Sequence, residues 1–389
     1  MSKVSTGAVA IVVAATALAT GAAASPSVGA PPVAQPDGRV SAIAVDAANG
    51  VVYIGGSFRH VADRRSGTQT RNRLAALRMT DGSLLPWAPG ADNTVEALTL
   101  VNGTLYVGGA FSSVTGSGSA VAGSRSRLAA IDATTGAVQS WNPGASATVN
   151  ALSASSTRLY VGGSFTSIGG ADRARLAAFL VGPTSAGQLD PLWTPKASGP
   201  VLGLTYSPVL QRLYVGGQFT TVNGAARPYG VAVAPDSGAV DPAFISPGYK
   251  LYQFAADASG VYAGGGGNGG HLVAWNTDGS LRHEYQTDGG VESVAVFNGE
   301  VYAGGHFQNY CLGDTGAGSP YVCSQPLRRM KLMSVDASGT VSAWNPTANS
   351  PLGVWSLSVD SAGTIYAGGD FTKINGQAQA HYAEFPPAG

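Results

Sequence analysis

Charge is scarce in this sequence, and its two signs balance. Only 11% of the 389 residues are charged, and 22 Lys or Arg stand against 22 Asp or Glu, which leaves a formal net charge of zero. Proteins that bind nucleic acid or an anionic membrane surface carry a basic excess, and disordered tails carry runs of like charge. We therefore expect no nucleic-acid partner and no membrane contact beyond a targeting segment.

Motifs for metal, phosphate and nucleophile chemistry are also missing. The sequence has no His-Glu-x-x-His motif, no calcium loop and no Gly-x-Ser-x-Gly elbow. Its many glycine pairs follow strand-like residues and lack the Lys and the helix that a phosphate-binding loop needs. We accordingly predict no metal site, no cofactor and no catalytic residues.

Cysteine is nearly absent, since Cys311 and Cys323 are the only two. An even count in an exported chain predicts one disulfide, which here closes a short loop. Export is predicted from residues 1–24, where Lys3 precedes an apolar run and Ala22-Ala23-Ala24 offers a small-residue cleavage site.

We expect the signal peptide to be cleaved after about Ala24 and the protein to be extracellular. An uncleaved membrane anchor is the alternative, because the apolar run approaches the length that spans a bilayer. Residues 25–32 are rich in Pro and Gly and predict an extended segment leading into a single domain over residues 33–389.

A repeated motif dominates the remaining chain. Seven glycine pairs, each after a Tyr-x dipeptide, define seven units whose first glycines lie about 52 residues apart on average, a period typical of propeller blades. Six copies have the full pattern Tyr-x-Gly-Gly-x-Phe, and the fifth, Tyr262 to Gly265, is degenerate. The full copies are Tyr53 to Phe58, Tyr106 to Phe111, Tyr160 to Phe165, Tyr214 to Phe219, Tyr302 to Phe307 and Tyr366 to Phe371.

Each unit reads as four short strands. In the second unit these are residues 95–100, 105–107, 128–131 and 138–141, with an Asn102-Gly103 hairpin turn between the first two. The apolar runs do not alternate strictly, which indicates strands covered on both faces. Glycine pairs let a neighbouring chain approach closely, and we interpret one aromatic residue per unit as packing between blades. These aromatics are Trp87, Trp141, Trp193, Phe244 and Trp344.

The two ends of the chain are predicted to meet. The seventh unit ends after its third strand, whereas the segment around Val33 to Pro36 resembles a fourth strand without a blade of its own. The predicted fold is therefore all-β: a seven-bladed β-propeller of four-stranded blades, closed by an N-terminal strand that completes the last blade.

These motifs resemble one known family. Tyr-Val-Gly-Gly-x-Phe, Val222-Asn223-Gly224, Arg127 to Ala130 and Trp141 to Gly144 are together similar to the delta-60 repeat family of secreted bacterial β-propellers, over residues 33–385. The resemblance implies an extracellular propeller in surface or adhesion-like proteins, with no settled chemistry. The glycine pairs also resemble kelch repeats, and Asp132 to Gly136 is similar to quinoprotein propellers, whose cofactor ligands find no match here.

Two sets of polar residues recur too regularly to indicate a specific site. Most Asp residues stand beside turn glycines and are expected to serve turn geometry. A basic residue precedes the third strand in almost every unit, and we expect it to hold the preceding loop. This second set comprises Arg73, Arg127, Arg175, His271, Lys331 and His381, with Tyr229 in the fourth unit.

Other residues break the repeat and are candidates for recognition. His306 and Asp370 follow the glycine pair in neighbouring units, where the other units have Ser57, Ala110 or similar residues. We predict that they lie near each other at one rim and bind a polar group; two unrelated exposed residues are the alternative.

The loops between second and third strands are the longest variable parts. The first unit's loop carries His60, Arg64 and Arg65, and the sixth unit's loop carries Arg328 and Arg329 beside the cysteines. Because these loops share one face of a propeller, we predict that a partner docks there.

The leading hypothesis is a secreted, monomeric, non-catalytic binding or scaffold module for an extracellular protein or polysaccharide. An extracellular glycan hydrolase or lyase is the alternative, with acid/base residues at the pore mouth drawn from Asp370, Glu292, Glu300 and His306. A third interpretation gives the chain a structural role at the bacterial surface. The fold alone does not separate these functions.

Overall fold

The computed structural model describes residues 26–27, 34–119, 122–181, 187–312 and 323–387. The predicted signal peptide lies outside these residues, as do most of the segment that follows it and Val33. Within the described residues the regular structure consists of β-strands alone, which confirms the all-β prediction. No helix in this part of the chain has the length and apolar character needed to cross a membrane.

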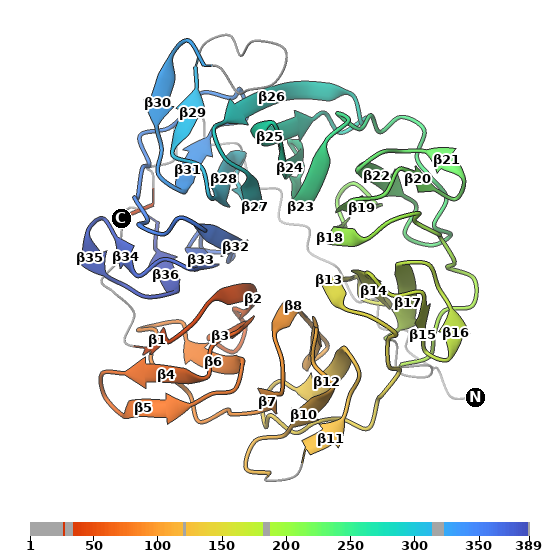
Figure 1. Cartoon of the computed structure of the whole chain (residues 1–389), viewed down its shortest axis with the longest axis vertical. Helices are drawn as coiled ribbons and strands as arrows, with labels where there is room; N and C mark the ends of the chain where they lie inside the picture. Colours follow the sequence, from red (N-terminus) through yellow and green to blue (C-terminus); the bar gives the residue numbers. More distant parts are fainter. Residues whose placement is uncertain (1–25, 28–33, 120–121, 182–186, 313–322, 388–389) are drawn as a thin grey trace, which may run out of the picture.

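Seven sheets radiate from one axis in the described residues, and the first strand of each lies innermost (Figure 1). Each innermost strand contacts the next one around the ring, and β32 contacts β2. From the axis outward the sheets are β2 (Val40–Asp46), β3 (Val51–Gly56) and β6 (Leu74–Arg78); β8 (Val95–Val101), β9 (Thr104–Gly109) and β12 (Leu128–Asp132); β13 (Val149–Ala154), β14 (Arg158–Gly163) and β17 (Leu176–Leu180); β18 (Val201–Ser207), β19 (Arg212–Gly217) and β22 (Gly230–Val233); β23 (Lys250–Asp257), β24 (Gly260–Gly267), β25 (Gly269–Trp275) and β26 (Leu281–Thr287); β27 (Val291–Phe297), β28 (Glu300–Gly305) and β31 (Leu332–Val335); and β32 (Val354–Val359), β33 (Ile365–Gly369) and β36 (Tyr382–Phe385).

The outermost strand is weaker than the sequence predicts. Only the fifth sheet has a full fourth strand among the described residues, and it continues from β26 into the hairpin of the sixth unit through the pairing of Thr287 with Tyr310. In five other sheets the outer segment forms a single isolated bridge to the third strand. Prolines and tight turns around these segments limit how many ladder hydrogen bonds they can form. The bridges are Leu77 to Leu84, Ile131 to Val138, Phe179 to Leu189, Val233 to Val240 and Val335 to Val341.

Six units carry a second hairpin between their second and third strands. These hairpins stand on the face where the innermost strands begin, because Val40 pairs with Gly56 at that end of the first sheet; we call it the hairpin face. The hairpins are β4 (His60–Asp63) with β5 (Gly67–Thr70), β10 (Ser113–Thr115) with β11 (Ala122–Ser124), β15 (Ser167–Ile168) with β16 (Ala171–Asp172), β20 (Thr221–Val222) with β21 (Ala225–Ala226), β29 (Asn309–Cys311) with β30 (Pro326–Arg328), and β34 (Lys373–Ile374) with β35 (Gln377–Ala378).

The prediction that the segment ending at Pro36 adds a strand to the last blade needs correction. Its described part, β1 (Ala34–Pro36), pairs with β4 of the first unit and not with β36. The segment before each innermost strand behaves in the same way elsewhere: β7 (Gly90–Ala91) pairs with β10. The end of the chain is reached instead through hydrogen bonds from Ser27 N–H and Oγ–H to Pro386 O and from Ala380 N–H to Gln35 Oε1. No sheet in the described residues joins the two ends.

Glycine pairs allow consecutive sheets to pack closely. A Cβ built on Gly162 would lie 2.5 Å from Cγ1 of Val201, the first valine of the next innermost strand. The same contact recurs where the ring closes, since a Cβ on Gly368 would lie 2.6 Å from Cγ1 of Val40. No side chain fits at such distances, so glycine is required for sheet-to-sheet contact.

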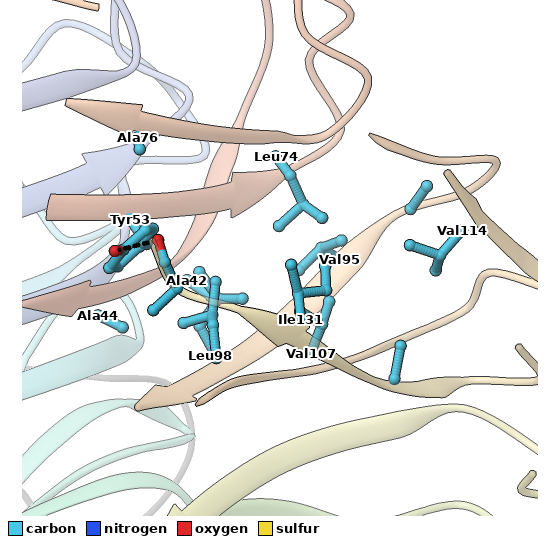
Figure 2. Close-up of a cluster of buried hydrophobic side chains, with 14 of the residues drawn as sticks. Ala42, Ala44, Tyr53, Leu74, Ala76, Val95, Leu98, Val107, Val114 and Ile131 are labelled. Atoms are coloured by element: carbon cyan, nitrogen blue, oxygen red, sulfur yellow. Dashed lines mark hydrogen bonds between the residues drawn. The ribbon is translucent and has the colours of Figure 1, made fainter. Parts of the chain in front are cut away.

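A hydrophobic cluster fills the space between neighbouring sheets. Between the first two sheets, Ala42, Leu74 and Val95 meet Leu98 and Val107 (Figure 2). Tyr53 lies in the same layer and donates its hydroxyl to the carbonyl of Ala133 in the second unit, at 2.7 Å.

The repeated aromatic residue links each sheet to the next, as predicted. The Trp141 ring packs edge-on against Tyr106 of its own unit and Phe179 of the next unit, with centroids 5.3 and 5.1 Å apart. Its indole N–H donates to Gly187 O at 2.8 Å. Trp87, Trp141 and Trp193 thus combine apolar burial with a hydrogen bond across the sheet boundary, whereas Trp344 links its neighbours by ring packing alone.

Replacing the first glycine of a pair should destabilise the ring. We expect Gly162→Ala and Gly368→Ala each to lower the free energy of unfolding by about 1–3 kcal/mol, because the added methyl overlaps a buried valine. Chemical denaturation monitored by tryptophan fluorescence measures the change. Gly123→Ala is the matched control, since its Cβ would lie 3.5 Å from the nearest side-chain atom. Equal midpoints for Gly162→Ala and the control would contradict this account.

Glu384 on β36 should make stability depend on pH. Burial raises its pKa from an ordinary 4.5 to about 7; a hydrogen bond from Tyr382 opposes the shift, and Asp81 and Asp360 add to it. The folded chain therefore holds this proton more tightly than the unfolded chain. Its stabilising contribution is complete below pH 4.5 and is lost as the pH rises through 7.

We therefore expect Glu384→Gln to gain about 1–3 kcal/mol of unfolding free energy relative to the wild type between pH 5 and pH 8. Urea denaturation at several pH values measures the difference, with Glu300→Gln as the control. If the difference in unfolding free energy between wild type and variant stays constant with pH, the pKa of Glu384 is not raised in the folded chain.

Candidate functional site

Three polar contacts recur from unit to unit and belong to the architecture. In the first, a side-chain oxygen on the segment before an innermost strand accepts the first backbone N–H groups of the hairpin. Asp37 does this for the N–H groups of Arg59 and His60, and its second oxygen lies 2.9 Å from His60 Nδ1. The predicted binding residue His60 thus belongs to a contact that other units make with Asp92, Ser146, Ser198, Asp288 and Asn349.

The second recurring contact is an arginine that ties the hairpin to the outer edge of its sheet. Arg329 donates one Nη to Arg328 O and the other to Ser342 O, at 2.9 and 3.0 Å. Arg71 and Arg125 make the same pair of hydrogen bonds in the first two units. The guanidinium of Arg329, a predicted binding residue, is therefore already engaged in the fold.

The third recurring position is the residue before the third strand. Its backbone adopts a positive φ, for example 69° at Arg127 and 75° at Lys331. The side chains bond to the preceding loop, since Lys331 Nζ donates to His306 O at 2.7 Å. The predicted loop-holding role is confirmed at Lys331 and at Arg127, which donates to Phe111 O. Arg73 instead bonds to Ala91 O on the segment that enters the next unit, and Arg175 Nε is buried without a hydrogen-bond partner. His271 differs, because it lies inside β25 and bonds to Glu284.

The remaining loop residues lie on the hairpin face. Arg65 forms an ion pair with Asp81 at 2.6 Å, whereas Arg64 is exposed. Arg328 is also exposed and lies 3.1 Å from Met330 Sδ. The predicted disulfide between Cys311 and Cys323 is present, with Cα atoms 5.6 Å apart, at the end of β29.

A second group of polar residues surrounds the axis on the hairpin face. Six innermost strands shift register between their first and third residues, so that the second residue is left out of the ladder. This residue lies near the one that follows the glycine pair: Glu292 bonds to His306, and Asn150 approaches Ser164. We call this region the inner rim.

His306 has two partners in its own unit. Its Nδ1 lies 3.1 Å from Glu292 Oε1, and its Nε2 accepts the backbone N–H of Gly290 at 3.0 Å. Because Nε2 accepts, the ring is neutral and Nδ1–H donates to the carboxylate. The His306 side chain remains 45% exposed, whereas Glu292 is 11% exposed.

Asp370 belongs to a different cluster from His306. Its Oδ2 accepts Nε–H of Arg39 at 2.6 Å, and the Arg39 guanidinium lies 4.2 Å above the Trp355 ring. No direct contact joins His306 to Asp370 in the described residues. The predicted pair therefore shares the inner rim but splits into two sites one unit apart.

Glu96, on the next innermost strand, completes the cluster around Arg39. It makes no hydrogen bond among the described residues, and burial raises its pKa, although the charge of Arg39 partly offsets this. Arg39 thus pairs with one carboxylate, that of Asp370, and its charge also acts on Glu96 on the neighbouring innermost strand. We name Arg39, Glu96, Trp355 and Asp370 the Arg39 cluster.

Sequence reasoning found Asp370 but missed Arg39, Glu96 and Trp355. The signal was present, because Glu96 and Trp355 occupy the out-of-ladder position of their strands, but register irregularities are not visible in a single sequence. Glu300, proposed for the enzyme alternative, begins β28 at the end opposite His306. The four acid/base candidates therefore do not all lie at the rim.

Comparison with known proteins identifies the class of fold. No protein-family model and no curated protein matches this chain. The WD40 β-propeller domain of Doa1 is similar in structure, with a TM-score of 0.53 and 12% identity over 90% of this chain and 94% of that one. The computationally designed Ika8 protein is similar over 92% of this chain and its own full length, with a TM-score of 0.52 and 12% identity.

At these identities the likeness shows the fold alone, and the chain has a β-propeller fold. The resemblance to the delta-60 repeat family stays a prediction.

The Arg39 cluster should be energetically coupled. In a double-mutant cycle of Arg39→Ala and Asp370→Ala, we expect a coupling of about 1 kcal/mol, because the ion pair is partly buried and the guanidinium is held on an indole ring. Urea denaturation of the four proteins measures it. Arg65 and Asp81 form the control pair; Arg65 is 63% exposed, and its coupling should stay below about 0.5 kcal/mol. A coupling no larger than that of the control would contradict the cluster.

Proposed function

We propose that this chain is a secreted, seven-bladed β-propeller that acts as a non-catalytic binding or scaffold module. In this proposal each of the seven sheets is one blade, and the hairpin face binds an extracellular protein or cell-surface polysaccharide. Propellers commonly serve as binding modules, and their ligands are held by side chains grafted on a repeated frame. The pattern of residues 1–24 and the disulfide of Cys311 and Cys323 support an extracellular location.

One observation carries the proposal. On the inner rim, the Arg39 cluster and the His306–Glu292 pair replace the small or uncharged residues that other units have at the same positions, such as Ala110 and Leu202. The recurring contacts account for His60, Arg329 and the loop-holding residues, but they do not account for these two groups. Polar side chains that break a repeat without serving its packing are expected at a site of recognition.

The contacts near the chain ends support a closed ring. Ser27 N–H donates to the carbonyl of Pro386, which follows β36. The Gln35 side chain accepts the backbone N–H of Ala380, which precedes β36. Two described residues of the N-terminal segment therefore contact the chain on either side of β36. Together with the packing of β32 against β2, these contacts support a ring that closes without a strand shared between the two chain ends.

Capture of a partner from cell envelopes and growth medium tests the proposal. The immobilised secreted protein should retain a partner that is lost when charge is reversed on the hairpin face, by Arg64→Glu with Arg328→Glu, or at the inner rim, by Asp370→Ala with His306→Ala. Asp278→Lys, in a turn on the opposite face, is the control and should capture as the wild type does.

Two outcomes would remove the proposal. Capture that is lost only in Asp278→Lys would place the binding surface on the other face. Cleavage of a purified polysaccharide by the wild type, lost in Asp370→Ala and His306→Ala, would instead support the hydrolase or lyase, because proton transfer would then depend on the inner rim.

A further inference from the structure

The Arg39 guanidinium has hydrogen-bonding capacity that the fold does not use. Its Nε–H is taken by Asp370, but neither Nη donates to any atom in the described residues. Both Nη atoms of Arg39 are reached by solvent, and the side chain is 30% exposed. The ion pair and the stacking on Trp355 fix the plane of the guanidinium, so both open donors are held in one orientation.

The frame of the propeller does not require an arginine here. In each ordinary unit, the residue before the innermost strand offers its backbone carbonyl to the N–H after the glycine pair, as Arg39 does for Ser57. The equivalent residues elsewhere are Thr94, Thr148, Pro200, Gly290 and Gly353, and in the fifth unit Lys250, which precedes the residue paired with the second glycine. Five of these six residues have no charged side chain, yet their units pack in the same way. The contact of Gly368 with Val40 closes the ring without Arg39.

Hydrogen-bond acceptors lie beside these donors. Glu96 is poorly solvated and forms no hydrogen bond among the described residues, so both its oxygens are open to a ligand. Asp370 uses Oδ2 for Arg39. A ligand that meets the cluster is therefore offered fixed donors and open acceptors within one small area.

The balance of charge restricts the class of ligand. Three acidic residues, Glu96, Glu292 and Asp370, lie at the inner rim with two basic residues, Arg39 and Lys250, and Nε2 of His306 accepts a hydrogen bond. A polyanion would meet excess negative charge, and a cation would meet the free donors of Arg39. Hydroxyl groups both donate and accept, and they need no countercharge.

We propose that the Arg39 cluster binds an uncharged saccharide, with ligand oxygens accepting from the two Nη groups of Arg39 and a ligand hydroxyl donating to Glu96. This inference rests on the proposed function and specifies its ligand: a neutral cell-surface or extracellular polysaccharide and not a protein. The Trp355 ring supports the guanidinium from below and is not the stacking surface for the sugar.

Isothermal titration calorimetry on the purified secreted protein tests this assignment. The probes are three neutral polysaccharides, dextran, mannan and galactan, with polygalacturonate and chitosan as charged counterparts. We expect saturable binding of at least one neutral probe. Arg39→Lys keeps the charge but loses the paired donors, and Glu96→Ala removes the acceptor, so each should weaken binding at least about tenfold. Asp278→Lys, in the turn on the opposite face, is the control and should bind within about twofold of the wild type.

Three results would overturn the inference. No binding of any neutral probe would exclude this ligand class, and binding of polygalacturonate that Arg39→Lys abolishes would make the cluster an anion site. Unchanged affinity in both variants would place the sugar elsewhere. If Arg39→Lys melts at a lower temperature than the wild type, its weaker binding could reflect lost stability. The affinity of Glu96→Ala then tests the site, because Glu96 makes no hydrogen bond among the described residues.

The same experiment separates this inference from the broader proposal. The protein could capture a partner from envelopes through the hairpin face and yet bind none of the neutral polysaccharides. That result would support the proposed binding module and reject only the saccharide as its ligand.

Discussion

The contact between a glycine on one sheet and a valine on the next is the constraint on which this molecule depends. The sheets can approach because Gly55, Gly108 and Gly162 have no Cβ where Val95, Val149 and Val201 fit. The aromatic side chains then span the boundary, and Trp87 and Trp141 each add a hydrogen bond to the next unit. The last sheet meets the first through the same contact, between Gly368 and Val40. The ring therefore closes by side-chain packing, although no described sheet joins the chain ends.

A frame of this kind separates structural residues from those free for recognition. Side chains with the same partner in unit after unit, such as Asp37, Arg329 and Lys331, hold hairpins and loops in place. They include much of the charge that the sequence presents in its loops. The charged side chains without such a repeated role include Arg39 and Glu96 near the axis. Arg39 pairs with Asp370 of the last unit, and Glu96 makes no hydrogen bond among the described residues.

Much of the fold could be read from the sequence because it depends on short-range patterns. The spacing of the glycine pairs, the Asn-Gly turns and the repeated aromatics predicted seven similar all-β units, and the two cysteines predicted the disulfide. The reading was less accurate at the outer edge, where isolated bridges replace full strands, and at Ala34–Pro36, which pairs with β4. Both depend on which of two nearby edges a short segment joins, and local propensity does not distinguish them.

The candidate site shows the same division. The sequence by itself determined that His306 and Asp370 break the repeat, because a departure from periodicity is visible in one chain. Only the tertiary structure decided that they belong to different clusters, and that Asp370 is joined to Arg39, which lies 331 residues earlier. Contacts between the first and last units arise from closure of the ring, and the geometry of closure is set by the packing of all the sheets together.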